Sequence, residues 1–373
     1  MKEPFKFFLI AGEPSGDLHG SKLIKAIKSL QPFSSFMGHG GDLMEKEGMK
    51  IVEHCNNLSV MGFNEVVVHL PRIWTIMKNT VALVRKIKPD RIILIDYPGF
   101  NLRFAKKISK FRIPISYFIL PQAWAWKSNR VEFIKKYFDQ SFSIFPFEQK
   151  WYKSKGVDTK YYGHPFMEID HLNENRVQFF KRHKFNQKEK LIALLPGSRQ
   201  QEINKHWGIY IETVALLKKT YPSLQVIVGR SDNVTLPKID KSFKIETNAR
   251  KAIIASDIAI VASGTATLEC AIEGTPLVVC YKVSTLTWLL AKLMVKIKHS
   301  SIVNLIAEKK IVPEFLQSEM KPNIIKNKIL ELIDEESKIR GQMIKNFHII
   351  KNKLGAPGVY AKIANEILKA TKI

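Results

Sequence analysis

Asp96 is placed by its sequence context to take a proton from a substrate hydroxyl. It directly follows the apolar run at 91–95 and precedes a turn formed by Pro98 and Gly99. At the end of a buried strand a carboxylate is partly removed from water, which raises its pKa and suits it to general base catalysis. The alternative is an Asp that caps the following helix, and it fits less well because Pro98 and Gly99 intervene.

A second group of chemically capable side chains lies in the loop 11–20, which reads AGEPSGDLHG. Its glycines allow close backbone approach, as a phosphate cradle requires, and Glu13, Ser15 and Asp17 add polar groups. The loop matches neither G-x-G-x-x-G nor the Walker pattern, which disfavours ATP hydrolysis through a P-loop. A turn in which Ser15 or Asp17 caps the following helix explains the same residues about equally well.

Two loops in the second half of the chain predict an anion-binding site. Arg199 ends the segment LLPGSR, where its guanidinium can clamp a phosphate through paired N–H donors. The small residues at 262–268 expose backbone N–H groups at a helix N-terminus, an arrangement that binds diphosphate, and Glu269 can then accept hydrogen bonds from ribose hydroxyls. The alternatives are a surface arginine in a turn and a helix cap made by Ser263 or Thr265.

The elements that must position these loops alternate between apolar strands and amphipathic helices. Strands are predicted at 5–11, 91–95, 115–120, 190–195, 224–228, 258–261 and 276–281, and helices at 21–30, 73–87, 100–111, 207–220, 249–255 and 265–273. Continuous apolar strands separated by helices indicate parallel sheets covered on both faces. Ligands bind such sheets at the carboxyl ends of the strands, which is where the loops above lie.

The chain length predicts two domains, because 373 residues exceed the usual size of one. A polar interval at 168–190 is the predicted linker. We therefore expect an N-terminal domain at 1–167, a C-terminal domain at 168–345 and a helical segment at 346–373 that packs back on the N-terminal domain or on a partner chain.

Composition restricts the partners. The formal net charge of +25 predicts an anionic partner, either nucleic acid, an anionic membrane surface or a phosphorylated small molecule. The three cysteines show no metal-ligand spacing and predict a reducing compartment, with the cytosol the best fit. No apolar run reaches the roughly 18 residues of a spanning helix, so membrane contact is expected to be peripheral.

Taken together and in order, these strings resemble the lipid-A-disaccharide synthase family. The matching segments are Ala11–Asp17, Ile95–Asn101, Trp124–Trp126, Pro146–Glu148, Gly163–His164, Leu195–Arg199, Ser263–Glu269, Asn304 and Val312–Gln317. Each string alone is a weak signal, whereas the ordered set across most of the chain is highly specific.

The resemblance implies an α/β protein with two Rossmann-like domains facing a central cleft, the GT-B type. The implied reaction is an inverting transfer of 2,3-diacylglucosamine from UDP-2,3-diacylglucosamine to 2,3-diacylglucosamine 1-phosphate, which gives a β-1,6-linked disaccharide and UDP, with no metal and no other cofactor. Another UDP-sugar transferase or epimerase is the alternative among enzymes. A basic nucleic-acid-binding protein is a remote alternative, because Lys and Arg are scattered along helices and no nucleic-acid-binding motif is present.

Roles for individual residues follow from the same resemblance. Asp96 would be the base on the acceptor 6-hydroxyl, and Glu13, Ser15 and Asp17 would shape the acceptor side. UDP would be held by Arg199, Ser263, Gly264, Thr265 and Glu269, with Asn304 and Gln317 as further donor-pocket residues. Many family members carry a second Asp where Gly99 stands, so an auxiliary role of that carboxylate is absent here.

The segment 59–77 is a candidate for contact with acyl chains or a membrane. It carries an apolar set broken at Pro71, with basic residues close by, and an interfacial helix has this composition; the set is Met61, Phe63, Val66, Val67, Leu70, Ile73 and Trp74. An ordinary amphipathic core helix explains it equally well, and 288–295 is a second candidate of the same kind. We therefore expect a cytoplasmic enzyme, peripheral on the anionic inner leaflet of the inner membrane, and leave a homodimer open.

Overall fold

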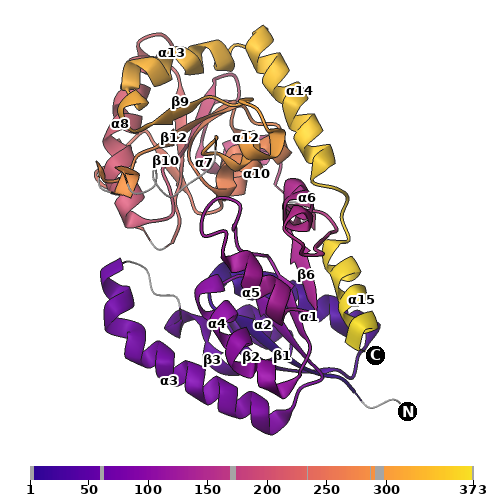
Figure 1. Cartoon of the computed structure of the whole chain (residues 1–373). Helices are drawn as coiled ribbons and strands as arrows, with labels where there is room; N and C mark the ends of the chain where they lie inside the picture. The colour runs from indigo at the N-terminus through magenta and orange to yellow at the C-terminus, as the bar shows by residue number, and fades with distance from the viewer. Residues whose placement is uncertain are drawn as a thin grey trace. The chain divides into compact units, whose positions relative to one another are not determined.

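The computed structural model describes residues 4–58, 63–168, 174–232, 234–285, 287–289 and 298–371, with the backbone alone at 63–70. The chain divides into two compact units (Figure 1). Unit 1 comprises Met1–Glu168 with Leu354–Ile373, and unit 2 comprises Ile169–Lys353. Each unit contains one sheet in which all the paired strands are parallel, so the predicted α/β class with two parallel sheets is confirmed.

The sheet of unit 1 has the order β3-β2-β1-β4-β5-β6-β7. Its strands are β1 (Lys6–Ala11), β2 (Ser35–Gly40), β3 (Lys50–His54), β4 (Arg91–Ile95), β5 (Ile115–Phe118), β6 (Gln140–Ser143) and β7 (Lys160–Tyr161). The direction of strand addition reverses between β1 and β4. Ligands in doubly wound sheets bind at this point, outside the carboxyl ends of the strands.

Helices cover both faces of this sheet (Figure 1). They are α1 (Pro14–Leu30), α2 (Asp42–Lys46), α3 (Phe63–Ile87), α4 (Pro98–Ile108), α5 (Arg130–Tyr137), α6 (Pro146–Ser154) and α15 (Val359–Thr371), with 3-10 turns at Cys55–Asn57, Ser109–Phe111 and Pro165–Glu168. In β1, Phe8 and Ile10 pack in the core under α3, α4 and α5, whereas Phe7 and Leu9 pack against α1 and α15. Burial on both faces is the reason that β1 after Lys6 and β4 after Arg91 contain only apolar residues.

The C-terminal helix α15 belongs to unit 1 and packs beside α1 (Figure 1). The buried guanidinium of Arg91 anchors its end, donating to the carbonyl of Ala370 at 2.6 Å and to Oγ1 of Thr371 at 2.9 Å. A cation is favourable at a helix C-terminus, where the last carbonyls lack partners within the helix. The helical layer on the α1 side of the unit 1 sheet therefore includes a helix from the C-terminal part of the sequence.

Helix α3 continues through Pro71. The expected break at this proline is wrong: the hydroxyl of Thr75 donates to the carbonyl of Pro71 at 3.1 Å, and the helix extends to Ile87. Proline removes one donor from a helix interior, and the remaining turns of α3 bury Ile76, Met77 and Val84 in the core. Tertiary packing thus outweighs the local cost of the proline.

The sheet of unit 2 has the order β10-β9-β8-β11-β12-β13, with its reversal between β8 and β11. Its strands are β8 (Leu191–Leu195), β9 (Gln225–Gly229), β10 (Lys244–Glu246), β11 (Ile258–Ala262), β12 (Leu277–Tyr281) and β13 (Glu314–Leu316). Its helices are α7 (Arg176–His183), α8 (Gln200–Lys218), α9 (Ala249–Ala255), α10 (Thr265–Glu273), α12 (Ile302–Ala307), α13 (Pro322–Ile333) and α14 (Lys338–Lys353), with a 3-10 turn at Gln317–Glu319.

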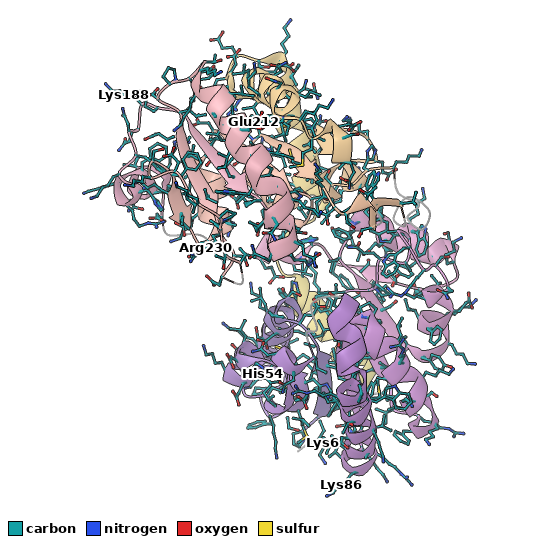
Figure 2. All side chains as sticks on the ribbon, turned by 90° about the vertical axis from the view of Figure 1, so that its left-hand side faces the viewer. Lys6, His54, Lys86, Lys188, Glu212 and Arg230 are labelled. Atoms are coloured by element: carbon teal, nitrogen blue, oxygen red, sulfur yellow. The ribbon has the colours of Figure 1, made fainter. Side chains whose placement is uncertain are left out.

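Basic side chains are found at both ends of the sheets. Figure 2 shows Lys6, at the amino end of β1, and Lys86, in the last turn of α3, projecting from the same end of unit 1. In unit 2, Lys188 precedes β8 and Arg230 follows β9, at opposite ends of that sheet (Figure 2). The positive charge is therefore not confined to the carboxyl ends of the strands. Among the described helices, none is both long and apolar enough to cross a bilayer.

Candidate active site

Glu13 and Asp96 come from loops that leave neighbouring strands of unit 1. β1 and β4 pair in parallel, with Ala11 opposite Ile95, so the two loops start side by side. This is the arrangement predicted from the carboxyl ends of adjacent strands. The two carboxylates are close enough that the charge of Glu13 raises the pKa of Asp96.

Asp96 and Tyr97 both adopt left-handed backbone conformations, with φ of 46° and 49°. Such conformations are unfavourable for residues other than glycine, cost roughly 1–3 kcal/mol each, and cluster at functional sites. Hydrogen bonds to the main chain hold the turn. The N–H of Asp96 donates to Phe118 O at 2.9 Å, and the carbonyl of Asp96 accepts from Nδ2 of Asn101 at 2.7 Å and from the hydroxyl of Tyr117 at 3.0 Å.

The ring of Tyr97 lies against the backbone of Gly12. A Cβ at Gly12 would overlap this ring, so glycine is required there. The hydroxyl of Tyr97 donates to the carbonyl of Leu58 at 2.9 Å, which fixes the ring at its other end. The glycine-rich loop predicts a close approach to its backbone, as by a phosphate. At Gly12 the group that approaches closely is the ring of Tyr97.

The environment of Asp96 suits it to accept a proton near neutral pH. Burial raises the pKa of Asp96 to about 6, and the negative charge of Glu13 acts in the same direction. The N–H of Tyr97 and the cation of Arg130 oppose this shift. A carboxylate with a pKa close to the working pH is an effective general base.

Arg130, the first residue of α5, was not among the residues predicted from the sequence. Its guanidinium lies over the ring of Trp126, 4.8 Å from the centroid, and its charge acts on Asp96. The only sequence signal was an arginine at the start of a helix that follows the loop after a strand end. This signal is weak because the distance from Asp96 depends on how α5 packs against α4.

A cavity of about 500 Å³ opens beside these residues in unit 1. Its wall is largely apolar, with one carboxylate and two cations, and the lining residues are Glu13, Leu58, Ile73, Trp74, Met77, Tyr97, Gly99, Phe100, Arg103 and Lys107. A second cavity of about 400 Å³ shares Trp74, Met77 and Lys107 with it. An apolar cavity with a few polar groups is typical of a ligand site.

Two residues of the predicted acyl or membrane set line this cavity, Ile73 and Trp74. The indole of Trp74 is 64% exposed, and Nζ of Lys107 lies 5.0 Å from its ring centroid. The rest of the set lies outside the described residues: this applies to Met61 and to the side chains of Phe63, Val66, Val67 and Leu70. The second candidate, 288–295, is described only at its first two residues.

Asp17 has a different position from Glu13 and Ser15, which are exposed. Its buried carboxylate accepts hydrogen bonds from the N–H groups of Gly41 at 2.8 Å, Leu43 at 3.1 Å and Met44 at 3.0 Å. Helix α1 has no side-chain cap of its own. Asp17 therefore caps the start of α2, and the alternative in which Ser15 or Asp17 caps the following helix, α1, is wrong.

Trp124 and Glu148 form a buried structural pair in unit 1. Nε1 of Trp124 donates to Oε1 of Glu148 at 2.9 Å, while Oε2 accepts from the N–H groups of Ile144 and Phe145 at 3.2 and 3.1 Å. Burial raises the pKa of Glu148 to about 7. The pair ties the loop after β5 to the start of α6.

Arg199 and the segment Ser263–Thr265 follow neighbouring strands of unit 2. β8 and β11 are parallel partners, with Leu195 opposite Val261. Oε2 of Glu202 accepts from the N–H groups of Ser198 and Arg199 at 3.1 and 3.3 Å, which fixes the first loop and leaves the Arg199 side chain 72% exposed. Nη1 of Arg199 lies 3.6 Å from Oε1 of Glu202, and the exposed remainder of the guanidinium can still bind an anion.

The second loop of unit 2 presents an uncapped helix start. Ser263 donates to the carbonyl of Ser300 at 2.8 Å, Gly264 is the N-cap with φ of 157°, and no side chain caps α10. The expected alternative, a cap made by Ser263 or Thr265, is therefore wrong. Burial raises the pKa of Glu269, one turn into α10, to about 7, and the charge of Arg250 opposes the shift. Uncapped N–H groups and the helix dipole favour an anion at this position.

Asn304 and Gln317, the two further predicted binding residues of unit 2, make hydrogen bonds within the chain. The buried amide of Asn304 donates to Val312 O at 2.9 Å and to Oε1 of Glu314 at 2.8 Å, and it accepts from the N–H groups of Ile311 and Val312 at 2.7 and 2.9 Å. The amide of Gln317 faces the N–H and carbonyl of Val283. Both side chains are thus engaged within the chain.

The family model for lipid-A-disaccharide synthetase matches residues 7–357. The chain belongs to the lipid-A-disaccharide synthase family. It is 34% identical over 377 residues to the lipid-A-disaccharide synthase of Myxococcus xanthus, with 99% of this chain and 98% of that protein covered. It is 34% identical to the corresponding protein of Rickettsia prowazekii, with 94% of each covered.

Solved structures show the same fold at low sequence identity. A UDP-GlcNAc 2-epimerase from Neisseria meningitidis matches with a TM-score of 0.62 and 13% identity over 98% of this chain and 99% of that chain. The glycotransferase of kitacinnamycin matches with a TM-score of 0.68 and 12% identity over 98% and 99%. These neighbours confirm the GT-B type of fold for this member of the family.

The structure places two pairs of predicted groups close together. Glu13 and Asp96 are neighbours in unit 1, and Arg199 and the start of α10 follow adjacent strands in unit 2. The structure adds Arg130 as a cation that acts on Asp96, and Arg103 and Lys107 in the wall of the nearby cavity; the sequence singled out none of the three. No group of three or more His, Cys, Asp or Glu able to hold a metal occurs in the described residues.

Proposed function

We propose that this chain transfers 2,3-diacylglucosamine from UDP-2,3-diacylglucosamine to the 6-hydroxyl of 2,3-diacylglucosamine 1-phosphate, which forms the β-1,6-linked disaccharide 1-phosphate of lipid A biosynthesis and releases UDP. Membership of the family supports the reaction class. The observation that carries the assignment to a site is Asp96, a carboxylate with a raised pKa in a strained turn beside an apolar cavity.

The mechanism requires one base and a stabilised leaving group. Asp96 takes the proton of the acceptor 6-hydroxyl as its oxygen attacks the anomeric carbon of the donor. The bond from that carbon to the UDP oxygen breaks, the electron pair leaves with UDP, and the anomeric configuration inverts. Protonated Asp96 then releases its proton to solvent.

The donor side supplies the stabilisation of UDP. Negative charge builds up on the diphosphate as the bond breaks, so positive groups in place before the reaction lower the barrier. The exposed guanidinium of Arg199 and the uncapped N-terminus of α10 are the groups available in unit 2. Thr265, exposed at the first position of α10, and Glu269 complete the proposed donor contacts.

The acceptor side must accommodate acyl chains. The cavity beside Asp96 has Leu58, Ile73, Trp74, Met77 and Phe100 in its wall, so it can contact a chain while the sugar lies near the carboxylates. Glu13 lines the same cavity and is placed to contact the sugar. Asp17 supports this side indirectly, through the loop that it caps.

We further propose that the protein acts at the cytoplasmic surface of the inner membrane. The exposed Trp74, the nearby Lys78 and Lys110 and the net charge of +25 support attraction to an anionic bilayer, worth roughly 1 kcal/mol for each Lys or Arg near the surface. Vesicle sedimentation tests this part. Release by high salt is expected, and retention at high salt would contradict it.

The reaction is tested with the purified chain, both acylated substrates in detergent micelles, and mass detection of the disaccharide and UDP. Formation of both products supports the proposal. Hydrolysis of the donor without disaccharide, or epimerisation of the sugar, would assign this chain another activity.

A further inference from the structure

We propose that Arg103 and Lys107 form the subsite for the phosphate monoester of the acceptor. This inference rests on the proposed function and adds the residues that distinguish a phosphorylated acceptor from an unphosphorylated one. Both residues lie on α4 and line the cavity beside Asp96.

The spacing along α4 presents one face of the helix to the cavity. Gly99, Arg103 and Lys107 follow one another at intervals of four residues, and all three line it. Residues at this spacing are neighbours on a helix surface, so the two cations lie side by side. A Cβ at Gly99 would meet no atom within 4 Å, which leaves space at the start of the face, next to Asp96.

Two like charges at this spacing are mildly destabilising unless an anion neutralises them. Within the described part of unit 1, the salt bridges join His54 to Asp42 and both Lys160 and Lys369 to Glu366, so neither cation of the pair has a carboxylate partner. Nζ of Lys107 is instead held over the ring of Trp74, at 5.0 Å from its centroid. The pair is therefore available to a ligand anion.

The residues that line the cavity indicate which class of anion it can bind. Its apolar wall suits a ligand that is also acylated, and Glu13 is the single carboxylate of the lining. A guanidinium with five donors and an ammonium with three can together bind the oxygens of a phosphate. An acylated sugar phosphate combines these two requirements in one molecule.

The distance along the helix is compatible with one sugar unit between base and phosphate. Arg103 follows Pro98 by five residues, which is ~7.5 Å along the axis at 1.5 Å per residue. The Cα–Cβ bonds of a helix tilt toward its N-terminus, so the side chain of Arg103 starts in the direction of the end of α4 that follows Asp96. A hexose with its 6-hydroxyl at Asp96 then directs its opposite end toward Arg103 and Lys107.

The test compares two acceptors in neutral detergent micelles, 2,3-diacylglucosamine 1-phosphate and the same sugar with a free 1-hydroxyl. The variants are Arg103→Gln, Lys107→Gln and the double variant. Lys106→Gln, an exposed lysine on the same helix outside the cavity lining, is the matched control. Thermal unfolding of each variant checks the fold.

We expect the double variant to lose roughly ten- to hundredfold in kcat/KM for the phosphorylated acceptor, as for lost hydrogen bonds to a charged group, mainly through KM. Activity with the free 1-hydroxyl sugar and the activity of Lys106→Gln should stay within about twofold of the parent. An equal loss for both acceptors would overturn the subsite, since it would mean that the pair acts on the fold.

A further arm separates the two sources of phosphate. If the variants matched the parent in neutral micelles and lost activity only on vesicles of anionic phospholipid, the pair would bind lipid headgroups and the acceptor assignment would be wrong. If the unmutated chain transferred sugar to neither acceptor, the proposed function itself would fail, whatever the variants did.

Discussion

The side-chain amide of Asn101 donates a 2.7 Å hydrogen bond to the main-chain carbonyl of Asp96. The hydroxyl of Tyr117 donates to the same carbonyl at 3.0 Å, and both donor residues are fully buried. The backbone conformation of the residue proposed as the base therefore depends on other residues. Two side chains from α4 and β5 hold its backbone in a region that Asp rarely occupies.

Replacing Asn101 with Ala should lower both stability and turnover. The carbonyl of Asp96 loses one donor in a buried place, which costs about 1–3 kcal/mol in the free energy of unfolding, and the carboxylate loses its fixed direction. We expect kcat to fall roughly tenfold with KM little changed, measured by steady-state kinetics and urea unfolding. Tyr117→Phe should have the same effects in weaker form.

Ser29→Ala is the matched control, because it removes a hydrogen bond from a side chain to the main chain of α1 far along the sequence from this turn. An Asn101→Ala protein that lost stability but kept the parental kcat would show that the turn does not set the reactivity of Asp96.

Replacing Glu13 with Gln should move the acidic limb of the pH–rate profile to lower pH. The negative charge of Glu13 raises the pKa of Asp96, so its removal lowers that pKa below its present value of about 6. Because the base must be ionised to act, activity would then persist to lower pH. Glu45→Gln, a change on α2, should leave the limb in place, and a shift to higher pH in Glu13→Gln would contradict the assignment.

Arg130 should act in the opposite direction. Its cation lowers the pKa of Asp96, so Arg130→Gln should raise that pKa and move the acidic limb to higher pH. Arg130→Lys keeps the charge and should restore most of the parental profile. If both variants at Arg130 changed kcat equally and left the pH dependence unaltered, the guanidinium would act through packing against Trp126 and not through charge.

Gly12→Ala should destabilise unit 1 by about 1–3 kcal/mol, because the added Cβ overlaps the ring of Tyr97 and forces a well-packed site to shift. Gly99→Ala is the matched comparison, since its Cβ has open space around it. Equal free energies of unfolding for the two variants would show that the packing of Tyr97 on Gly12 is not required.

The strands that are almost wholly apolar could be predicted from the sequence, and the strands with polar residues or glycine could not. β8 and β11 are wholly apolar, and β1 and β4 are apolar after their first residues, Lys6 and Arg91, because both faces of these strands are covered. β2 contains Gly38 and the buried His39, whose Nε2 pairs with the hydroxyl of Thr80 on α3. Strands such as β2, β7 and β13 form because a neighbour is available for pairing, and local pattern does not contain that information.

The same distinction applies to the site. Asp96, Glu13 and Arg199 could be predicted because they follow recognisable strand ends. The role of Asp17 could not, since it depends on the N–H groups of α2, more than twenty residues further along the chain. Arg130 acts on Asp96 through the packing of α5 against α4, so its spacing in the sequence carried no signal.

The most direct test of the account is Asp96→Asn, measured for transfer and for stability across pH. The amide cannot accept the proton, so kcat should fall at least ~100-fold. The raised pKa means that the folded state of the parent protein loses stability as pH rises from about 4, the unfolded value, through about 6. Because the amide does not ionise, the variant should be more stable than the parent above pH 6, by about 1–3 kcal/mol, and the advantage should vanish below pH 4. Near-normal transfer by Asp96→Asn, with no gain in stability at pH 8, would contradict the assignment of Asp96 as the partly buried catalytic base.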